Sequence, residues 1–350
     1  MKLCNDCEIV EEEKNEIRLY IRPKKDINYF CKNFESEKIG FTNIGNSCYM
    51  NSILQILLHI PNFVENLKND YKKSKNESEL IQCIINLSDY PNDNKNLYSI
   101  QKYMSIISNN YEQFHQGDSQ NFGIDLINEI INNIKEEGEE NISSQYNKNI
   151  NKNKINNYKK YKYEKFIHQY QNEEKLIALE KMFVVNEYIS MNIKNKFKYS
   201  FFCNLGIELV FPDEKKGIYN LKNLLDYKYS NCNNNLKKIC NIPKILIITV
   251  LRAFFNGTLN DSILKFPEEL NISDYIDKDL IKKNDSLKYK LLAINEKLGF
   301  SKEYGHYFCK IKLKNQWFLF DDEKVILAEN QINSSYCSKN VVGLFYINSK

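Results

Sequence analysis

The sequence predicts an α+β fold with a helical first half and a β-rich second half. Up to about Glu136 the apolar residues recur at helical spacing, and after about Lys175 runs of β-branched and aromatic residues alternate with turn residues. Residues 137–175, rich in asparagine, lysine, tyrosine and glutamate, have no usable apolar period and are interpreted as a low-complexity insertion. We therefore expect an extension of unknown use at 1–39 and one domain at 40–350, made of a helical part (40–136), the insertion (137–175) and a β-rich part (176–350).

Composition narrows the class of protein. The net charge of the 350 residues is 49 − 45 = +4, with acidic and basic residues interspersed, so nothing indicates a nucleic-acid surface. The longest apolar runs are too short to span a membrane, and no secretory signal is recognisable. Ten irregularly spaced cysteines then predict reduced thiols in an intracellular protein, and the lone Cys4/Cys7 pair is weak support for a metal site. The sequence leaves the oligomeric state open.

Three helices are expected in the helical part. One begins near Cys48 and stops at Pro61, and a second contains Leu80, Ile81, Ile84, Ile85 and Leu87. A third contains Ile100, Met104 and Ile107. Seven stretches of the second half are predicted as mostly antiparallel strands: Met182–Ile189, Ser200–Val210, Lys244–Phe255, Tyr289–Ile294, His306–Leu313, Trp317–Phe320 and Val341–Ile347.

Cys48 lies between a loop and the first apolar helix. The loop Asn43–Ser47 contains a glycine and two asparagines, residues that tolerate left-handed backbone. A cysteine at a helix N-terminus meets unpaired N–H groups and the positive end of the helix dipole, which favour the thiolate. Cys48 is therefore a candidate nucleophile, although most unpaired cysteines are small buried hydrophobic residues.

A fourth helix is expected after Asp118. Phe122, Leu126, Ile130 and Ile134 recur every four residues, as in an amphipathic helix that faces the core. Asp118 occupies the N-cap position, so its simplest interpretation is a helix cap.

A hairpin in the β-rich part can bring a base and an acid together. If Lys314–Asn315 is a two-residue turn, Leu313 pairs with Gln316, and His306 becomes a diagonal cross-strand neighbour of Asp321. A histidine that accepts the thiol proton and an acid that orients the imidazole are what a catalytic cysteine requires. A histidine at a strand edge is more often structural, but together with Cys48 the three residues favour catalysis.

These stretches resemble the ubiquitin-specific protease family of deubiquitinases. GFTNIGNSCYMNSILQ resembles the family's Cys box, GHY with QWFLFDDEKV and GLFYI its His box, QGDSQNF its acidic motif, and IPKILIITVLRAF its palm strand. The resemblance runs with gaps from about Gly40 to Tyr346. It implies a papain-like cysteine protease with a helical thumb and a β-rich palm and fingers.

The resemblance also implies roles for single residues. Cys48 corresponds to the nucleophile, His306 to the general base and later acid, and Asp321 to the residue that orients His306. Asn43 matches the side chain that donates to the oxyanion together with the backbone N–H of Cys48. Asp118 matches an acidic position that binds the arginine-bearing tail of ubiquitin.

Gln120 and Tyr307 are the further substrate-binding candidates in the same motifs. No cofactor is expected. The family commonly has glutamate where this chain has Asn121, and Cys203, Cys232 and Cys240 do not form the two CxxC pairs that hold zinc in many members. A metal site is therefore not expected. LRAF replaces the usual Lys-Arg-Phe of the palm motif, so the alignment of Arg252 and Phe254 is uncertain by one residue.

The expected function is hydrolysis of the bond after the C-terminal glycine of ubiquitin by a thiol-dependent deubiquitinase, with ubiquitin or ubiquitinated proteins as partners. Two alternatives remain open at this point. The chain could be an inactive ubiquitin-binding pseudoenzyme, motivated by Asn121 and the divergent fingers, or a protease for a ubiquitin-like modifier, since surface contacts outside the motifs select the modifier.

Overall fold

The structure is a computed structural model, and it separates the chain into two compact units, Met1–Lys38 and Ile39–Lys350. It describes residues 7–11, 19–23, 39–74, 76–135, 176–193, 196–212, 217–230, 235–253, 260–278, 286–299, 305–328 and 336–349. In the first unit β1 (Cys7–Glu11) pairs antiparallel with β2 (Leu19–Pro23). The predicted insertion at 137–175 and the residues Cys4, Cys232 and Phe254 lie outside the described residues.

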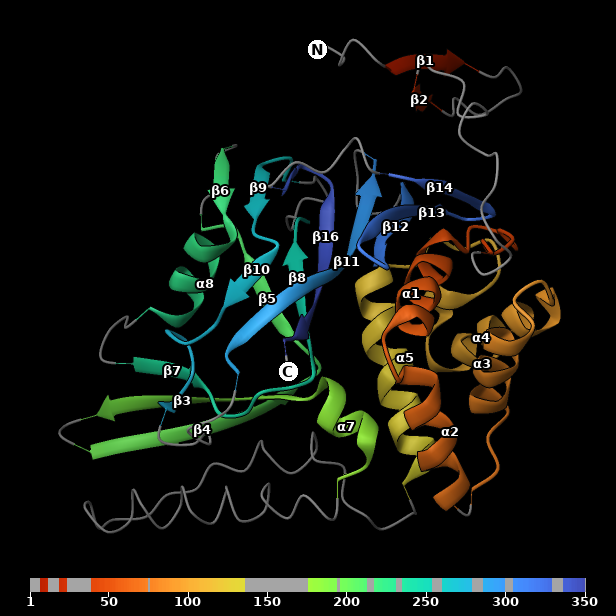
Figure 1. Cartoon of the computed structure of the whole chain (residues 1–350). Helices are drawn as coiled ribbons and strands as arrows, with labels where there is room; N and C mark the ends of the chain where they lie inside the picture. Colours follow the sequence, from red (N-terminus) through yellow and green to blue (C-terminus); the bar gives the residue numbers. More distant parts are fainter. Residues whose placement is uncertain are drawn as a thin grey trace. The chain divides into compact units, whose positions relative to one another are not determined.

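The first part of the second unit is helical, as predicted (Figure 1). Its helices are α1 (Cys48–His59), α2 (Phe63–Lys73), α3 (Glu79–Asp89), α4 (Asn94–Ile107), the 3-10 turn η2 (Asn109–Tyr111) and α5 (Ser119–Ile134). The four expected helices correspond to α1, α3, α4 and α5, and α1 ends two residues before Pro61. Among the described helices, none is long and apolar enough to cross a membrane.

The second part is built on an eight-stranded sheet, which we call the palm sheet. Its strand order is β14 (Lys324–Leu327), β13 (Gln316–Asp321), β12 (His306–Leu313), β11 (Lys288–Leu298), β16 (Val341–Asn348), β8 (Ile245–Leu251) and β5 (Ile207–Val210), with β10 (Glu269–Asn271) also paired to β11. Only the β5–β8 pair of this sheet is parallel, so the predicted antiparallel character is confirmed.

Two smaller sheets and two helices complete the described residues. The sheets are β4–β3–β7, formed by Lys196–Asn204, Val185–Ile193 and Asn235–Ile239, and β15–β9–β6, formed by Tyr336–Ser338, Ile263–Phe266 and Ile218–Asn220. The helices are α7 (Ala178–Phe183) and α8 (Leu221–Tyr229), which the sequence did not predict.

Two predicted strands were wrong in extent. The stretch Met182–Ile189 begins inside α7, because Asp70 of α2 accepts a hydrogen bond from the Leu179 N–H at 3.2 Å and Glu180 pairs with Lys135 at 2.5 Å. Tertiary partners therefore stabilise a helical turn that the apolar pattern does not reveal.

The stretch Ser200–Val210 is not one strand but two. It contributes β4 to one sheet and β5 to another, with a turn at Leu205–Gly206 between them. Apolar residues continue through the turn from Phe201 and Phe202 to Leu205 and Ile207, so the pattern alone could not locate the break.

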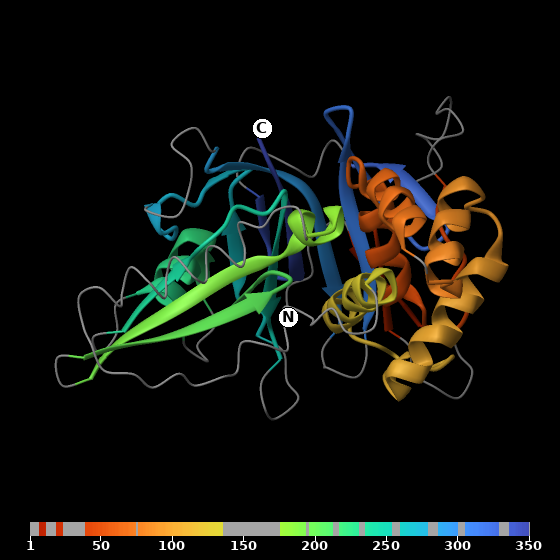
Figure 2. The same ribbon diagram turned by 90° about the horizontal axis from the view of Figure 1, so that it is seen from below.

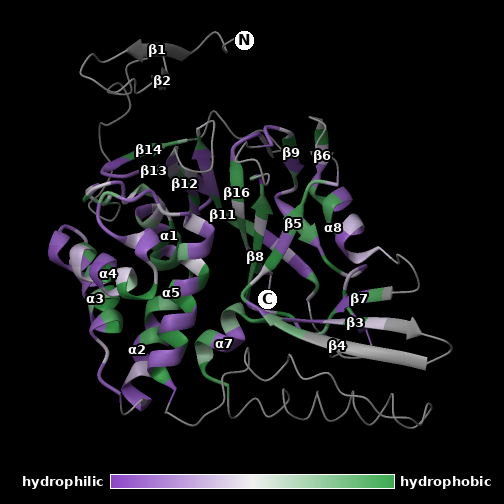
Figure 3. Ribbon diagram, turned by 180° about the vertical axis from the view of Figure 1, so that it is seen from behind, coloured by the Kyte–Doolittle hydropathy of each residue, from purple (hydrophilic) through white to green (hydrophobic). Residues whose placement is uncertain are grey.

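The palm sheet is covered on both faces, which explains why its strand β8 is almost wholly apolar. Ile245 and Ile247 face a core shared with the thumb helices, and the alternate residues Leu246, Ile248 and Val250 face a second core with α8. In Figure 3 hydrophobic residues are concentrated on β8 and β16, while α2 and α5 carry both colours. Figure 2 shows the thumb helices gathered on one side of the sheet.

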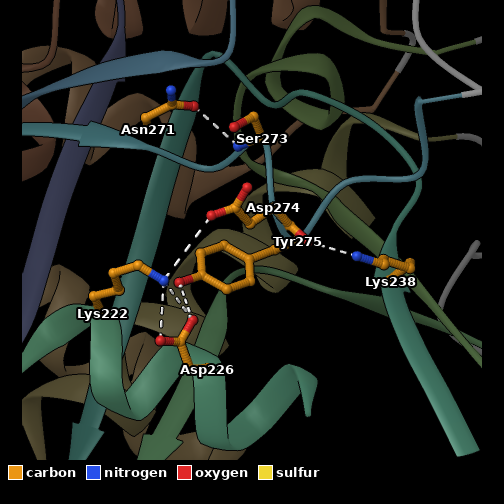
Figure 4. A network of polar contacts seen from close by, with 7 residues as sticks. All are labelled: Lys222, Asp226, Lys238, Asn271, Ser273, Asp274 and Tyr275. Carbon is orange, nitrogen blue, oxygen red and sulfur yellow. Dashed lines mark hydrogen bonds and ion pairs between the residues drawn. The ribbon is translucent and has the colours of Figure 1, made fainter. Parts of the chain in front are cut away.

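Exposed polar contacts connect α8 to the segment that follows β10 (Figure 4). Lys222 pairs with Asp226 at 2.9 Å and approaches Asp274 at 3.9 Å, and Asp226 also accepts from the Tyr275 hydroxyl at 2.8 Å. The Lys222 side chain is 64% exposed, and exposed ion pairs contribute little to stability. Burial of the Tyr275 ring, rather than these charges, holds the segment on α8.

Arg252, unlike the exposed Lys222, makes its polar contacts in the interior, because its side chain is buried at the end of β8. Its guanidinium donates to the backbone carbonyls of Val341 at 2.6 Å, Asn260 at 2.9 Å and Ser262 at 2.8 Å. A fourth donation reaches Ser338 at 3.2 Å. Burial lowers the pKa of Arg252 to about 10, which still leaves it charged at neutral pH. Arg252 thereby connects β8, the segment before β9 and the start of β16.

We expect Arg252→Ala to lower the free energy of unfolding by about 3 kcal/mol, the upper end for leaving buried polar groups without partners. Urea denaturation followed by circular dichroism measures the change. Lys222→Ala, which removes an exposed cation from the same half, is the matched control and should not shift the midpoint. Equal midpoints for Arg252→Ala and the wild type would contradict the role given to Arg252.

Candidate active site

The site is assembled at the N-terminus of α1. Cys48 is the first residue of the helix and is 3% exposed. The preceding loop contains Gly45 at φ 114° and Asn46 at φ 53°, the left-handed backbone that its residue types predicted. The side-chain oxygen of Asn43, Oδ1, accepts from the backbone N–H groups of Gly45 at 3.2 Å and Ser47 at 3.1 Å. This small network fixes the direction from which the chain enters α1.

The β12–β13 hairpin carries His306 and Asp321, the predicted base and its orienting acid. Leu313 pairs with Gln316 across the Lys314–Asn315 turn, as predicted. One nitrogen of His306, Nε2, is hydrogen-bonded to Oδ1 of Asp321. The other hydrogen-bond partner of the imidazole is the Cys48 side chain, which leaves Nδ1 as the nitrogen facing the sulfur. The structure thus brings together the three residues that the sequence proposed as a catalytic group.

The ring of His306 is held in its protonated form. Burial lowers its pKa, but the hydrogen bonds and charges of Asp321 and Cys48 outweigh burial and raise the pKa from 6.5 to about 10. The His306 and Asp321 side chains are each 39% exposed, so a substrate can reach them. A protonated imidazole beside sulfur is the pairing that activates cysteine nucleophiles.

Asp322, the neighbour of Asp321, is a residue that the sequence analysis missed. Its carboxylate accepts from the side-chain amides of Asn43 at 2.9 Å and Asn51 at 2.8 Å. Its backbone oxygen accepts from the Phe41 N–H at 2.9 Å. Burial raises the pKa of the Asp322 carboxyl, and the two amide donors oppose that rise. The second aspartate of FDDEK, which follows the last residue of β13 in the turn before β14, was the available signal.

Asn43 is exposed, and its amide nitrogen donates to Asp322. An amide group has two N–H bonds, so one remains for another acceptor. Its predicted oxyanion role stays a prediction.

The substrate-binding candidates lie at the N-terminus of α5. Asp118 caps the helix by accepting from the N–H groups of Gln120 at 3.0 Å and Asn121 at 3.1 Å, and it also accepts from the Tyr307 hydroxyl at 3.1 Å. The predicted role of Asp118 as a helix cap is confirmed. Its side chain is half buried, and its predicted contact with the tail of ubiquitin stays a prediction.

Gln120 and Tyr307 have structural partners. The Gln120 side chain donates to the backbone oxygens of Val250, at 3.3 Å, and Val342, so it joins α5 to the palm sheet. Tyr307 is 1% exposed, and burial together with Asp118 raises the pKa of its hydroxyl. Contact of either residue with substrate stays a prediction.

A group of potential metal ligands coincides with this site. His306, Asp321 and Asp322 offer ligand atoms within 4.8 Å of one another. Two of these residues already bond to each other and the third is engaged by amides, so the donor set is used within the protein.

Comparison with known proteins identifies the family. A sequence model described as "Ubiquitin carboxyl-terminal hydrolase" matches residues 39–346, nearly the whole second unit. The chain belongs to the ubiquitin carboxyl-terminal hydrolase family. The chain is therefore a cysteine-type hydrolase of the deubiquitinase class, and the cysteine, histidine and aspartate described above lie within the matched residues.

Individual relatives of this hydrolase are distant. Over 332 residues the chain is 24% identical to ubiquitin carboxyl-terminal hydrolase 4 of Arabidopsis thaliana, covering 85% of this chain and 88% of the relative. It is 23% identical to the probable ubiquitin carboxyl-terminal hydrolase 16 of Schizosaccharomyces pombe, covering 87% of this chain and 66% of that protein.

Solved structures show the same fold. The SAGA Ubp8/Sgf11/Sus1/Sgf73 DUB module bound to ubiquitin aldehyde contains a chain that matches with a TM-score of 0.63 at 19% identity, over 90% of this hydrolase and 71% of that chain. A yeast SAGA DUB module matches with a TM-score of 0.64 at 19% identity, over 90% and 69%. The papain-like fold with thumb, palm and fingers is thereby confirmed.

We expect Asp321→Asn to lower the pKa of His306 from about 10, because the substitution removes the carboxylate that stabilises the imidazolium. The measurement is an NMR titration of the His306 ring, assigned by its absence in His306→Gln. Because the folded pKa is raised, the pair's contribution to stability is full below about pH 6.5 and declines as the pH approaches 10. An unchanged midpoint in Asp321→Asn would show that Asp321 does not set this pKa.

Asp322→Ala should reduce turnover roughly 10²-fold, as expected when reacting groups are misplaced by about an ångström. It should also cost about 1–3 kcal/mol of stability, because hydrogen bonds to a charged carboxylate are lost. The Asn51 amide then keeps only its longer contacts with the backbone oxygens of Phe41 at 3.3 Å and Thr42 at 3.2 Å. Asp322→Asn retains one carbonyl oxygen and should recover part of both losses. Full activity in Asp322→Ala would contradict this positioning role.

Proposed function

We propose that residues 40–350 form a catalytic domain that hydrolyses the bond after the C-terminal glycine of ubiquitin, and that 1–39 is an accessory extension. The observation that carries the proposal is the chain of hydrogen bonds from Cys48 through His306 to Asp321 at a helix N-terminus. Membership of the ubiquitin carboxyl-terminal hydrolase family supplies the substrate class.

In this mechanism the Cys48 proton resides on His306, and the sulfur attacks the carbonyl carbon of the glycine. The carbonyl electron pair moves to oxygen, where the backbone N–H of Cys48 and the second N–H of Asn43 stabilise the negative charge. When that pair returns, the C–N bond breaks and His306 gives its proton to the departing lysine amine. A water molecule, deprotonated by His306, then releases the acyl group from Cys48.

Asp321 holds the imidazole in place throughout, and no step of this scheme requires a cofactor. We propose that Asp118 meets the arginine-bearing tail of ubiquitin, with Gln120 and Tyr307 beside it. One of the solved structures with this fold is described as bound to ubiquitin aldehyde, which makes ubiquitin the first substrate to test.

We also propose an intracellular location. Among the described residues Cys48, Cys83, Cys240 and Cys309 are free thiols, as is usual for proteins of reducing compartments. Ubiquitin conjugates as substrates agree with such a location.

The purified chain should release a fluorophore from a ubiquitin C-terminal conjugate and be labelled at Cys48 by a ubiquitin electrophile. Cys48→Ala should lower turnover on the order of 10⁴-fold or more, since it removes the nucleophile. Mass spectrometry of the labelled peptide identifies the modified residue. Ubiquitin binding without labelling would indicate a pseudoenzyme. Labelling only by electrophiles built on ubiquitin-like modifiers would show that the substrate is such a modifier and not ubiquitin. Full activity in Cys48→Ala would refute the mechanism.

A further inference from the structure

A second loop is fastened to the loop that precedes Cys48. Asn46 donates from its side chain to the backbone oxygen of Phe114 at 2.6 Å, and the Phe114 N–H donates to Gly45 at 3.2 Å. The Gln113 side chain donates to the oxygen of Ile44 at 3.0 Å. Three hydrogen bonds thus hold the segment before α5 against the loop that fixes the nucleophile.

The side chain of Gln116 in this second loop points at the reacting atom. Its Nε2 donates to Sγ of Cys48 at 3.6 Å, and the residue is half buried. The next residue, Gly117, packs so closely on α1 that a Cβ there would lie 2.7 Å from the Tyr49 ring. Only glycine permits this approach, so the backbone that carries Gln116 is set by contact with the first turn of α1.

We propose that Gln116 is a catalytic residue that donates a hydrogen bond to the oxyanion, in addition to Asn43 and the Cys48 N–H. The proposal rests on the acyl-transfer function proposed above. When Sγ bonds to the carbonyl carbon, the negative charge leaves sulfur and the carbonyl electron pair moves to oxygen. That oxygen is one C–S bond and one C–O bond from Sγ, so it forms close to the sulfur. In the proposed geometry it forms on the side of Sγ that Gln116 approaches, and the amide donor shifts to it.

Transfer of the hydrogen bond from sulfur to oxygen is what makes the contact catalytic. A donor that remained on sulfur would stabilise the free thiolate and would not lower the barrier, because only interactions that strengthen in the transition state accelerate a reaction. When the oxyanion collapses, its electron pair re-forms the carbonyl and the C–N bond breaks, and Gln116 returns to the sulfur after hydrolysis.

The neighbouring amide explains why a second side-chain donor is useful here. One N–H of Asn43 is engaged by Asp322 at 2.9 Å, so Asn43 has only one left for the oxyanion. Gln116 approaches from a different loop, and within the part of the chain that the structure describes its side-chain amide donates to the sulfur. The two amides therefore act from separate segments on one developing charge.

Two reactions of Cys48 separate the oxyanion role from an effect on the thiol itself. Hydrolysis of a ubiquitin C-terminal fluorophore passes through an oxyanion, whereas alkylation by iodoacetamide displaces iodide at a saturated carbon and does not. Gln116→Ala should lower kcat for the fluorophore substrate on the order of 10²-fold, with KM nearly unchanged. The rate of alkylation should change little.

Gln116→Met keeps the length of the side chain but has no hydrogen-bond donor, so it should show the same loss of kcat. With two variants, a folding defect in one of them does not decide the outcome. Gln82→Ala, on the exposed face of α3, is the matched control and should retain wild-type kcat. Equal loss of hydrolysis and alkylation, or no loss of hydrolysis, would overturn the proposal for Gln116. Absence of ubiquitin hydrolysis in the wild type would instead refute the proposed function.

Discussion

The active site depends on the carboxylate of Asp322, which joins the turn after β13 to α1 and the loop before it. It accepts from Asn43 in the loop before α1 and from Asn51 on the first turn of that helix. The residue before it, Asp321, holds His306. The end of β13 and the turn after it therefore hold both His306, the proposed base, and the segment that carries Cys48, the proposed nucleophile. In the sequence 258 residues (306 − 48) separate Cys48 from His306. Because the carboxylate is partly buried, removing either amide would leave its charge less compensated.

The turn between β13 and β14 is supported by the packing of the sheet around it. β12 and β13 lie inside the palm sheet, whose two faces are covered by separate apolar cores. The N-terminus of α5 is joined to the same sheet by Gln120 and by a hydrogen bond from Asn295 to Ser119 at 3.0 Å. The loop that carries Gln116 is thus held between α1 and the palm, which lets side chains from several segments meet at one sulfur.

Local sequence predicted those parts of the fold that local physics determines. The period of Phe122 to Ile134 predicted α5, and the glycine and asparagine of the Cys48 loop predicted its left-handed backbone. The two-residue turn at Lys314–Asn315 predicted the register that places His306 beside Asp321. α7 was mistaken for strand because its stability comes from Asp70 and Lys135, which are distant in sequence.

The sequence by itself determined the family and the helical and β-rich halves, and it predicted the catalytic group of Cys48, His306 and Asp321, because the motifs are local and specific. Three contacts were decided only by the tertiary structure. The Asn43 amide donates to Asp322, Gln120 joins α5 to the palm sheet, and Gln116 faces the sulfur of Cys48. These contacts depend on how loops far apart in the chain pack together. No periodicity or propensity encodes such packing, because both describe the backbone within a few residues.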